Sequence, residues 1–114
     1  MKYMLLMYAH PSETEAMSAS DRDSVLARHK ALVAELTESS KLLDGAGLDY
    51  PRTATTLRWN RGDPVTAEGP FVEAREQLTA YYVVDCASLE RARELARRVL
   101  DFHVTAVDVR RIHT

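Results

Sequence analysis

Two apolar runs dominate the pattern of hydrophobic and polar positions along the chain. Residues 2–9 and 78–84 are apolar at odd and even positions alike, which is typical of central strands covered on both faces. Residues 53–59, 65–66 and 104–112 are β-branched or alternating and predict further strands. In the last of these, Val107 and Val109 would face one side of the sheet, and Asp108 and Arg110 the other.

Two other segments carry the helical spacing of apolar residues. The first is predicted to run from Ser20, as N-cap, to about Asp44, with Gly45 as the stop signal. Its apolar stripe consists of Val25, His29, Leu32, Leu36 and Leu43. The second helix follows the cap residue Ser88, and its stripe consists of Leu89, Ala92, Ala96 and Val99. Residues 13–19, between the first strand and the first helix, predict a polar loop.

The order of these elements is strand, helix, hairpin, strand, helix, strand. It predicts an α+β fold, a ferredoxin-like sandwich with two helices on one face of a mainly antiparallel sheet. A chain of 114 residues is expected to form a single domain, residues 1–114. Because two helices can cover only one face of strands that are apolar on both, the other face needs a partner. The simplest partner is a second copy of the chain.

Composition excludes several classes of protein. A net charge of −2 argues against a nucleic-acid-binding protein, and the arginines at 91, 93, 97 and 98 alternate with glutamates as on a solvated helix face. The single cysteine, Cys86, excludes an intrachain disulfide framework and is predicted to be a buried small hydrophobe. The first apolar run is too short for a membrane span or a signal peptide. We therefore expect a cytoplasmic protein that binds neither membrane nor nucleic acid.

Residues 68–77, with the sequence EGPFVEAREQ, form the most distinctive stretch of the chain. Gly69 and Pro70 predict a rigid bend before Phe71, because glycine permits positive φ and proline fixes its own φ. The bend is surrounded by three acidic side chains, which are Glu68, Glu73 and Glu76. Such a cluster must be solvated, paired with cations or used chemically.

This stretch resembles the Asp-Gly-Pro-Phe signature of the YCII-related proteins, also called the DGPF-domain family, with Glu68 in the place of the aspartate. The likeness extends to the opening residues 1–6, to 47–56 and to the Tyr81-Tyr82 strand. It implies a dimeric α/β barrel in which two sheets pack face to face. It also implies a role for the histidine of the first helix, here His29, together with an aspartate near the end of the second helix. Asp101 is the matching candidate.

His29 is the sharpest candidate for chemistry, since it lies inside the apolar stripe and should point at the sheet. Such an imidazole needs either a hydrogen-bond partner in the core or a wet cavity beside it. The four histidines show no paired short spacing typical of a metal site, and no phosphate loop or dinucleotide fingerprint is present. We therefore expect neither a metal nor a cofactor.

Two functions remain open. The first is a homodimer without catalytic activity that binds a small molecule or a protein, with the bend at residues 68–71 shaping the surface. The second is a cofactor-independent lyase, dehalogenase-like enzyme or hydrolase in which His29 transfers a proton. Asp101, or a signature glutamate in second place, would orient the imidazole, and Tyr8 or Tyr82 would donate to a developing oxyanion.

Overall fold

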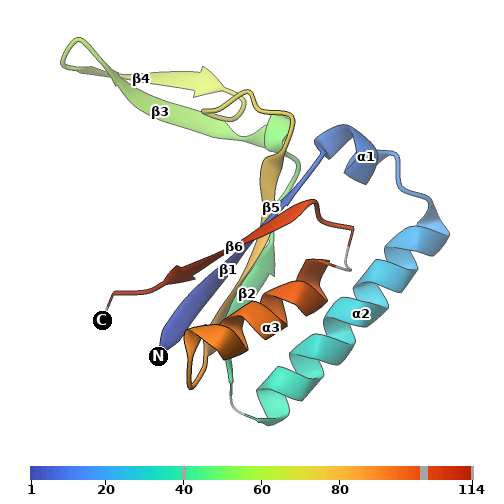
Figure 1. Cartoon of the computed structure of the whole chain (residues 1–114). Coiled ribbons are helices and arrows are strands. Elements are labelled where there is room, and N and C mark those ends of the chain that lie inside the picture. The colour runs from blue at the N-terminus through green and yellow to red at the C-terminus, as the bar shows by residue number, and fades with distance from the viewer. Residues whose placement is uncertain (40, 101–102, 114) are drawn as a thin grey trace.

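The computed structural model describes residues 1–39, 41–100 and 103–113. Four antiparallel strands form the main sheet in the order β2-β5-β1-β6, with bounds β1 Lys2–Ala9, β2 Leu42–Gly47, β5 Gln77–Asp85 and β6 Ala106–Arg111. The helices α2 (Ala19–Glu38) and α3 (Leu89–Leu100) lie on one side of this sheet (Figure 1). The predicted ferredoxin-like α+β arrangement is therefore confirmed for the single chain.

The hydrophobic core lies between the sheet and the two long helices. Strand β1 contributes every second residue to it, because successive side chains of a strand point to opposite faces. The buried members are Tyr3, Leu5 and Met7 of β1, Tyr82 and Val84 of β5, Leu32 and Leu36 of α2, Ala92, Leu95, Ala96 and Val99 of α3, and Cys86. The prediction that Cys86 is buried is confirmed, and burial raises the pKa of its thiol.

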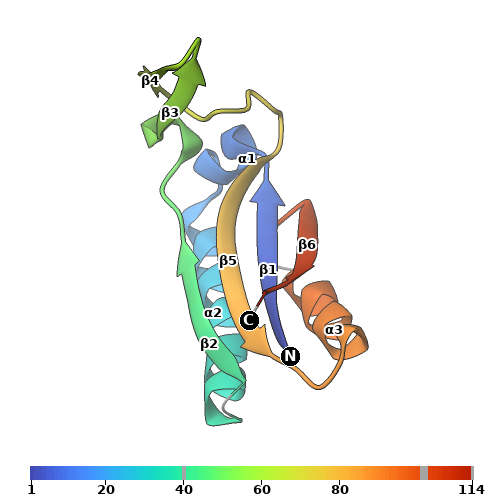
Figure 2. The same ribbon diagram turned by 90° about the vertical axis from the view of Figure 1, so that its left-hand side faces the viewer.

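Among the described residues, no helix lies over the opposite face of the sheet (Figure 2). Met4, Leu6 and Tyr8 of β1 and Tyr81 and Val83 of β5 alternate with the core residues and are only half-buried. In a single chain the helices therefore cover one face of the first strand, and cover of the other face by a second copy stays a prediction. We call this surface, formed by residues 4, 6, 8, 81 and 83, the open face.

The first long helix ends earlier than the periodicity predicts. Helix α2 stops at Glu38 rather than near Asp44, and Leu42–Gly47 form the edge strand β2. The Asp85 N–H donates to the Lys41 carbonyl at 2.8 Å, so the chain leaves the helix directly onto β5. Leucines seven residues apart fit a helix, but pairing with a neighbouring strand outweighs this weak local preference.

The start of α2 also differs from the prediction, since Ser18 and not Ser20 is the N-cap. The Ser18 hydroxyl oxygen accepts from the Asp21 N–H at 3.1 Å. Both serines have an aspartate three residues later, so local sequence does not decide between them. Before this cap, Pro11–Glu15 form the short helix α1 where a loop is predicted, and proline in its first turn favours this. The Ser88 cap of α3 is confirmed, because its oxygen accepts from the Arg91 N–H at 3.2 Å.

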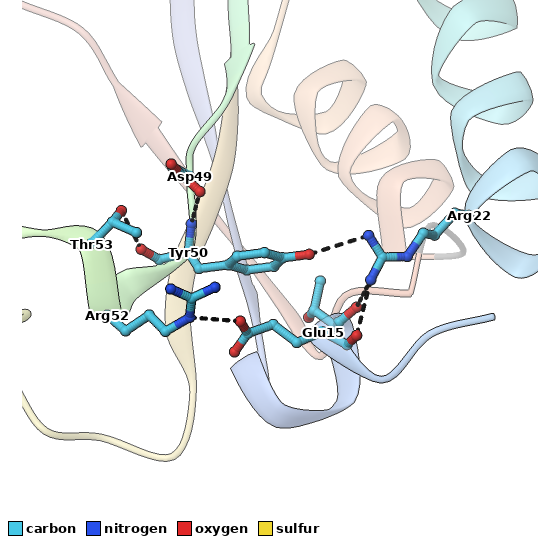
Figure 3. A network of polar contacts seen from close by, with 7 residues as sticks. Glu15, Arg22, Asp49, Tyr50, Arg52 and Thr53 are labelled. Atoms are coloured by element: carbon cyan, nitrogen blue, oxygen red, sulfur yellow. Dashed lines mark hydrogen bonds and ion pairs between the residues drawn. The ribbon is translucent and has the colours of Figure 1, made fainter. Parts of the chain in front are cut away.

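A hairpin made of β3 (Thr55–Asn60) and β4 (Asp63–Glu68) stands apart from the main sheet (Figure 1). Its turn residues Arg61 and Gly62 both have positive φ, as a two-residue type I′ turn requires. At its base, the 3-10 helix η1 (Pro51–Thr53) is tied to the rest of the chain by a polar network (Figure 3).

That network joins the base of the hairpin to α1 and α2. The Arg22 guanidinium donates to the Tyr50 hydroxyl at 3.2 Å and to the Glu15 carbonyl at 2.9 Å (Figure 3). The Arg52 guanidinium donates to the Glu15 carboxylate at 2.8 Å and lies over the Tyr50 ring, 5.4 Å from its centroid. The segment that leads into the hairpin is therefore held in one orientation.

Candidate functional site

The candidate site is built on a contact between α2 and β5. Tyr82 projects from the helix-covered face of β5, where it is paired with Leu5 and only 6% exposed. His29 comes from the sheet-facing side of α2, and its Nδ1 atom is hydrogen-bonded to the Tyr82 hydroxyl. The two ring centroids are 5.8 Å apart and the rings are tilted by 53°. The prediction that His29 points toward the sheet is confirmed.

Burial disfavours the charged form of both members of this pair. It lowers the pKa of His29 and raises the pKa of Tyr82, because each charged form would lose hydration. Two proton arrangements satisfy the contact. Either the Tyr82 hydroxyl donates to Nδ1 and the proton of the imidazole is on Nε2, or Nδ1–H donates to the tyrosine oxygen and Nε2 is an acceptor. The pair can therefore offer a donor or an acceptor to a third group.

His29 and Tyr82 line a cavity of about 290 Å³ between α2 and the β2 edge of the sheet. Apart from this pair and Tyr81, its walls are aliphatic or glycine. Among the described residues, the lining consists of Met7, Leu26, His29, Val33, Gly45, Ala46, Gly47, Ala80, Tyr81 and Tyr82. The sequence indicates that the imidazole needs either a hydrogen-bond partner or an adjacent cavity, and the structure provides both.

Two glycines of β2 shape the cavity in different ways. A Cβ atom at Gly45 would lie 2.6 Å from Cδ1 of Tyr82, so the absence of a side chain lets the Tyr82 ring lie against β2. A Cβ atom at Gly47 would meet no atom within 4 Å. Gly47 is paired with Ala80, which lines the same cavity, so a side chain there would enter the free volume. The sequence-based interpretation of Gly45 as a helix stop is wrong.

The residues 68–77 lie elsewhere in the molecule, at the junction of the hairpin and β5. Gly69 has φ of +95°, as the predicted bend requires. Its N–H donates to the Ala54 carbonyl at 2.7 Å, and its carbonyl accepts from the Thr56 hydroxyl at 2.7 Å. These bonds fasten the bend to the start of β3. Pro70 lines a separate cavity of about 270 Å³ next to Tyr50.

Two residues at the end of this segment, Arg75 and Glu76, contact His10 rather than His29. The Arg75 guanidinium donates to Nδ1 of His10 at 3.0 Å, and Nε2 of His10 lies 3.4 Å from the Glu76 carboxylate. With Nδ1 as an acceptor, the imidazole proton belongs on Nε2, facing the carboxylate. Both ring nitrogens of His10, which follows the end of β1, are thus engaged by the signature segment.

The remaining candidates are dispersed. Tyr8 lies on the open face, and burial together with a hydrogen bond to Asp108 raises the pKa of its phenol. Since Tyr82 is on the helix-covered face, only one of the two tyrosines considered for an oxyanion contact is near His29. Glu68, Phe71 and Glu73 are exposed, Phe71 to 70%. Asp101 lies outside the described residues.

The structure therefore brings His29 and Tyr82 together and separates them from the signature bend. Sequence reasoning misses Gly45 and Gly47 as part of the site, although a glycine pair next to a predicted strand was a usable signal.

Among the described residues, no group of three or more His, Cys, Asp or Glu side chains could hold a metal ion. Within the same residues, no helix is long and apolar enough to cross a membrane.

Exchange of Gly45 for alanine tests the close approach of Tyr82 to β2. We expect Gly45→Ala to lower the free energy of unfolding by about 1–3 kcal/mol, because the added methyl group displaces the tyrosine ring. The matched control Gly47→Ala adds the same atom in open space and should be neutral or slightly stabilising. Urea denaturation measures both, and equal stability of the two variants would contradict this role of Gly45.

The buried state of His29 predicts a specific dependence of stability on pH. Because its folded pKa is below the ordinary value of 6.5, the unfolded chain binds more protons as the pH falls. Stability should therefore decrease below about pH 6.5 and go on decreasing down to the folded pKa. Histidine NMR titration and urea denaturation at pH 7 and pH 5 measure this, with His29→Asn as the variant that loses this contribution. A titration midpoint at or above 6.5 would show that the ring is not desolvated.

Comparison with known proteins agrees with the resemblance found in the sequence. The profile of the YCII-related domain matches residues 1–112. The chain is also similar to an uncharacterised protein of Rhizobium meliloti (strain 1021), with 37% identity over 97 residues, which cover 85% of this chain and 78% of that relative. A match over nearly the whole length, together with a relative at this identity, establishes the relationship. The chain belongs to the YCII-related domain family.

Proposed function

We propose that this protein binds a small organic molecule in the cavity beside His29 and Tyr82. The observation that carries the proposal is a hydrogen-bonded imidazole–phenol pair in the wall of an otherwise largely apolar cavity of about 290 Å³. Ligand sites typically combine apolar walls with a few placed polar groups. A pair that can act as donor or acceptor would orient one polar atom of the ligand.

The volume of the cavity and the charges of its lining residues narrow the class of ligand. The volume is at the lower end of the range for ligand pockets, about 300–1,000 Å³, which favours a molecule with a single ring. None of the ten lining residues is an aspartate, glutamate, lysine or arginine. A charged ligand would lose hydration there without an opposite charge on any of these ten described residues, so a neutral molecule with one hydroxyl or carbonyl group fits best.

The same contact supports a second function, catalysis by proton transfer. A neutral imidazole with Nδ1 on a phenol can accept a proton at Nε2 from a bound acid, while its partner tyrosine steadies the ring. This function requires His29 to be unprotonated at the working pH, which the direction of its pKa shift favours. A ring already protonated at pH 7 would exclude His29 as a base but would leave binding possible.

Filling the cavity tests the binding proposal. We expect 4-methylphenol and benzyl alcohol, as probes, to shift the amide NMR signals of Gly45, Gly47 and Ala80 in the wild-type protein. Gly47→Val should weaken these shifts at least about tenfold, since its side chain occupies the free volume without a clash at Cβ. Leu89→Val, at an exposed position outside the cavity lining, is the control and should bind as the wild type does. Probes that shift other residues, or that bind Gly47→Val unchanged, would contradict the proposed site.

We further propose that two copies pair through their open faces, as in a dimeric α/β barrel. The chain has a solvent-accessible surface of 7800 Å². A compact monomer of 12.9 kDa would have about 6,300 Å². The surplus of about 1,500 Å² lies within the 1,000–2,500 Å² that each protomer of an obligate dimer buries. The half-buried apolar residues of the open face supply a surface of the required kind.

A charge on the open face should prevent this pairing. Leu6 lies at its centre, between β5 and β6, so Leu6→Arg should yield a folded monomer. Sedimentation equilibrium should give the wild type about twice the chain mass of 12.9 kDa and the variant the single mass. Leu89→Arg, on the helical side and 41% exposed, is the matched control and should remain dimeric. A wild type that is monomeric at 100 μM, or a dimeric Leu6→Arg variant, would refute face-to-face pairing.

A further inference from the structure

The β3–β4 hairpin extends away from the compact part of the chain, toward the side on which the open face lies (Figures 1 and 2). The radius of gyration of 15.8 Å reflects this extension. A compact domain of this length would have a radius of gyration of about 13 Å. The hairpin therefore overhangs the space in front of the open face instead of packing on its own chain.

Apolar side chains are exposed on one side of this hairpin. Leu57 and Trp59 alternate with polar residues along β3 and are 70% and 76% exposed. Their cross-strand partners are Thr66 and Pro64, so neither large side chain is covered from β4. In the single chain, the indole ring of Trp59 is exposed to water. Tryptophan is among the commonest anchors of protein interfaces, so an exposed indole indicates a surface that meets a partner.

The base of the hairpin is fixed, which distinguishes it from a loose loop. The Arg22–Tyr50 and Arg52–Glu15 contacts hold the segment before β3 to the helices (Figure 3). On the other strand, the Gly69 N–H bond to Ala54 closes the end of β4 against the start of β3. An element anchored at both ends loses little conformational entropy when its tip meets a partner.

We propose that the hairpin is an arm that closes on the second copy of the chain, with Trp59 and Leu57 buried against that copy. The inference rests on the proposed pairing of open faces, which places the second copy in the space that the hairpin overhangs. By two-fold symmetry each chain then receives the arm of the other.

Trp59 is the only tryptophan of the chain, so its fluorescence reports on the arm alone. In the wild-type dimer we expect a blue-shifted emission and acrylamide quenching several times weaker than for free tryptophan. In the Leu6→Arg variant, and on dilution of the wild type below its dissociation constant, Trp59 should emit as an exposed indole. Trp59→Ala should raise the dimer dissociation constant about thirtyfold, as expected for a central anchor.

Leu89→Ala removes an apolar side chain that is 41% exposed on the helical side, and it should leave the dissociation constant unchanged. Circular dichroism checks that each variant is folded. If the wild type dimerises but Trp59 stays fully quenchable and Trp59→Ala dimerises normally, the arm is refuted and the open-face pairing stands. If the wild type is monomeric throughout, both are refuted. Shielding of Trp59 only on addition of lipid vesicles would likewise overturn the proposal and identify a membrane as the occupant.

Discussion

The structure depends on one constraint, a sheet whose two central strands, β1 and β5, are apolar on both faces but have helices over only one. The alternation along β1 sends Tyr3, Leu5 and Met7 into the core beneath α2 and α3, and Met4 and Leu6 to the other side. The helices thus cover one of the two faces of these strands. The half-buried apolar residues of the other face underlie the proposed pairing of two copies.

The candidate site arises at the edge of this layered core, where packing is incomplete. Strand β2 carries glycine at two positions, and α2 does not fill the space above them. An imidazole in the apolar stripe of a helix can be accommodated there because the Tyr82 hydroxyl supplies its hydrogen bond. The result is a polar pair with both charged forms disfavoured, next to a cavity with room for a small molecule. Binding is the simplest use of such a site, and proton transfer is the more specialised one.

The most distinctive stretch of the sequence serves the architecture in the described structure. Its glycine makes the bend between hairpin and sheet, and its Arg75 and Glu76 engage His10 at the end of β1. The segment thereby sets the direction in which the hairpin leaves the sheet. A distinctive motif can therefore act on function indirectly, here by setting the direction of the hairpin that we propose as an arm.

The sequence by itself determined the α+β class, the two central strands, the inward direction of His29, the positive φ of Gly69 and the membership of the family. These follow from local periodicity, from the steric freedom of glycine and from motif identity, all of which are properties of neighbouring residues. Only the tertiary structure decided where α2 ends, since Leu42–Gly47 become a strand by pairing with β5. Likewise, only the structure paired His29 with Tyr82 and Glu76 with His10. Contacts between residues more than fifty positions apart are decided by register and packing of the whole chain, which no local pattern encodes.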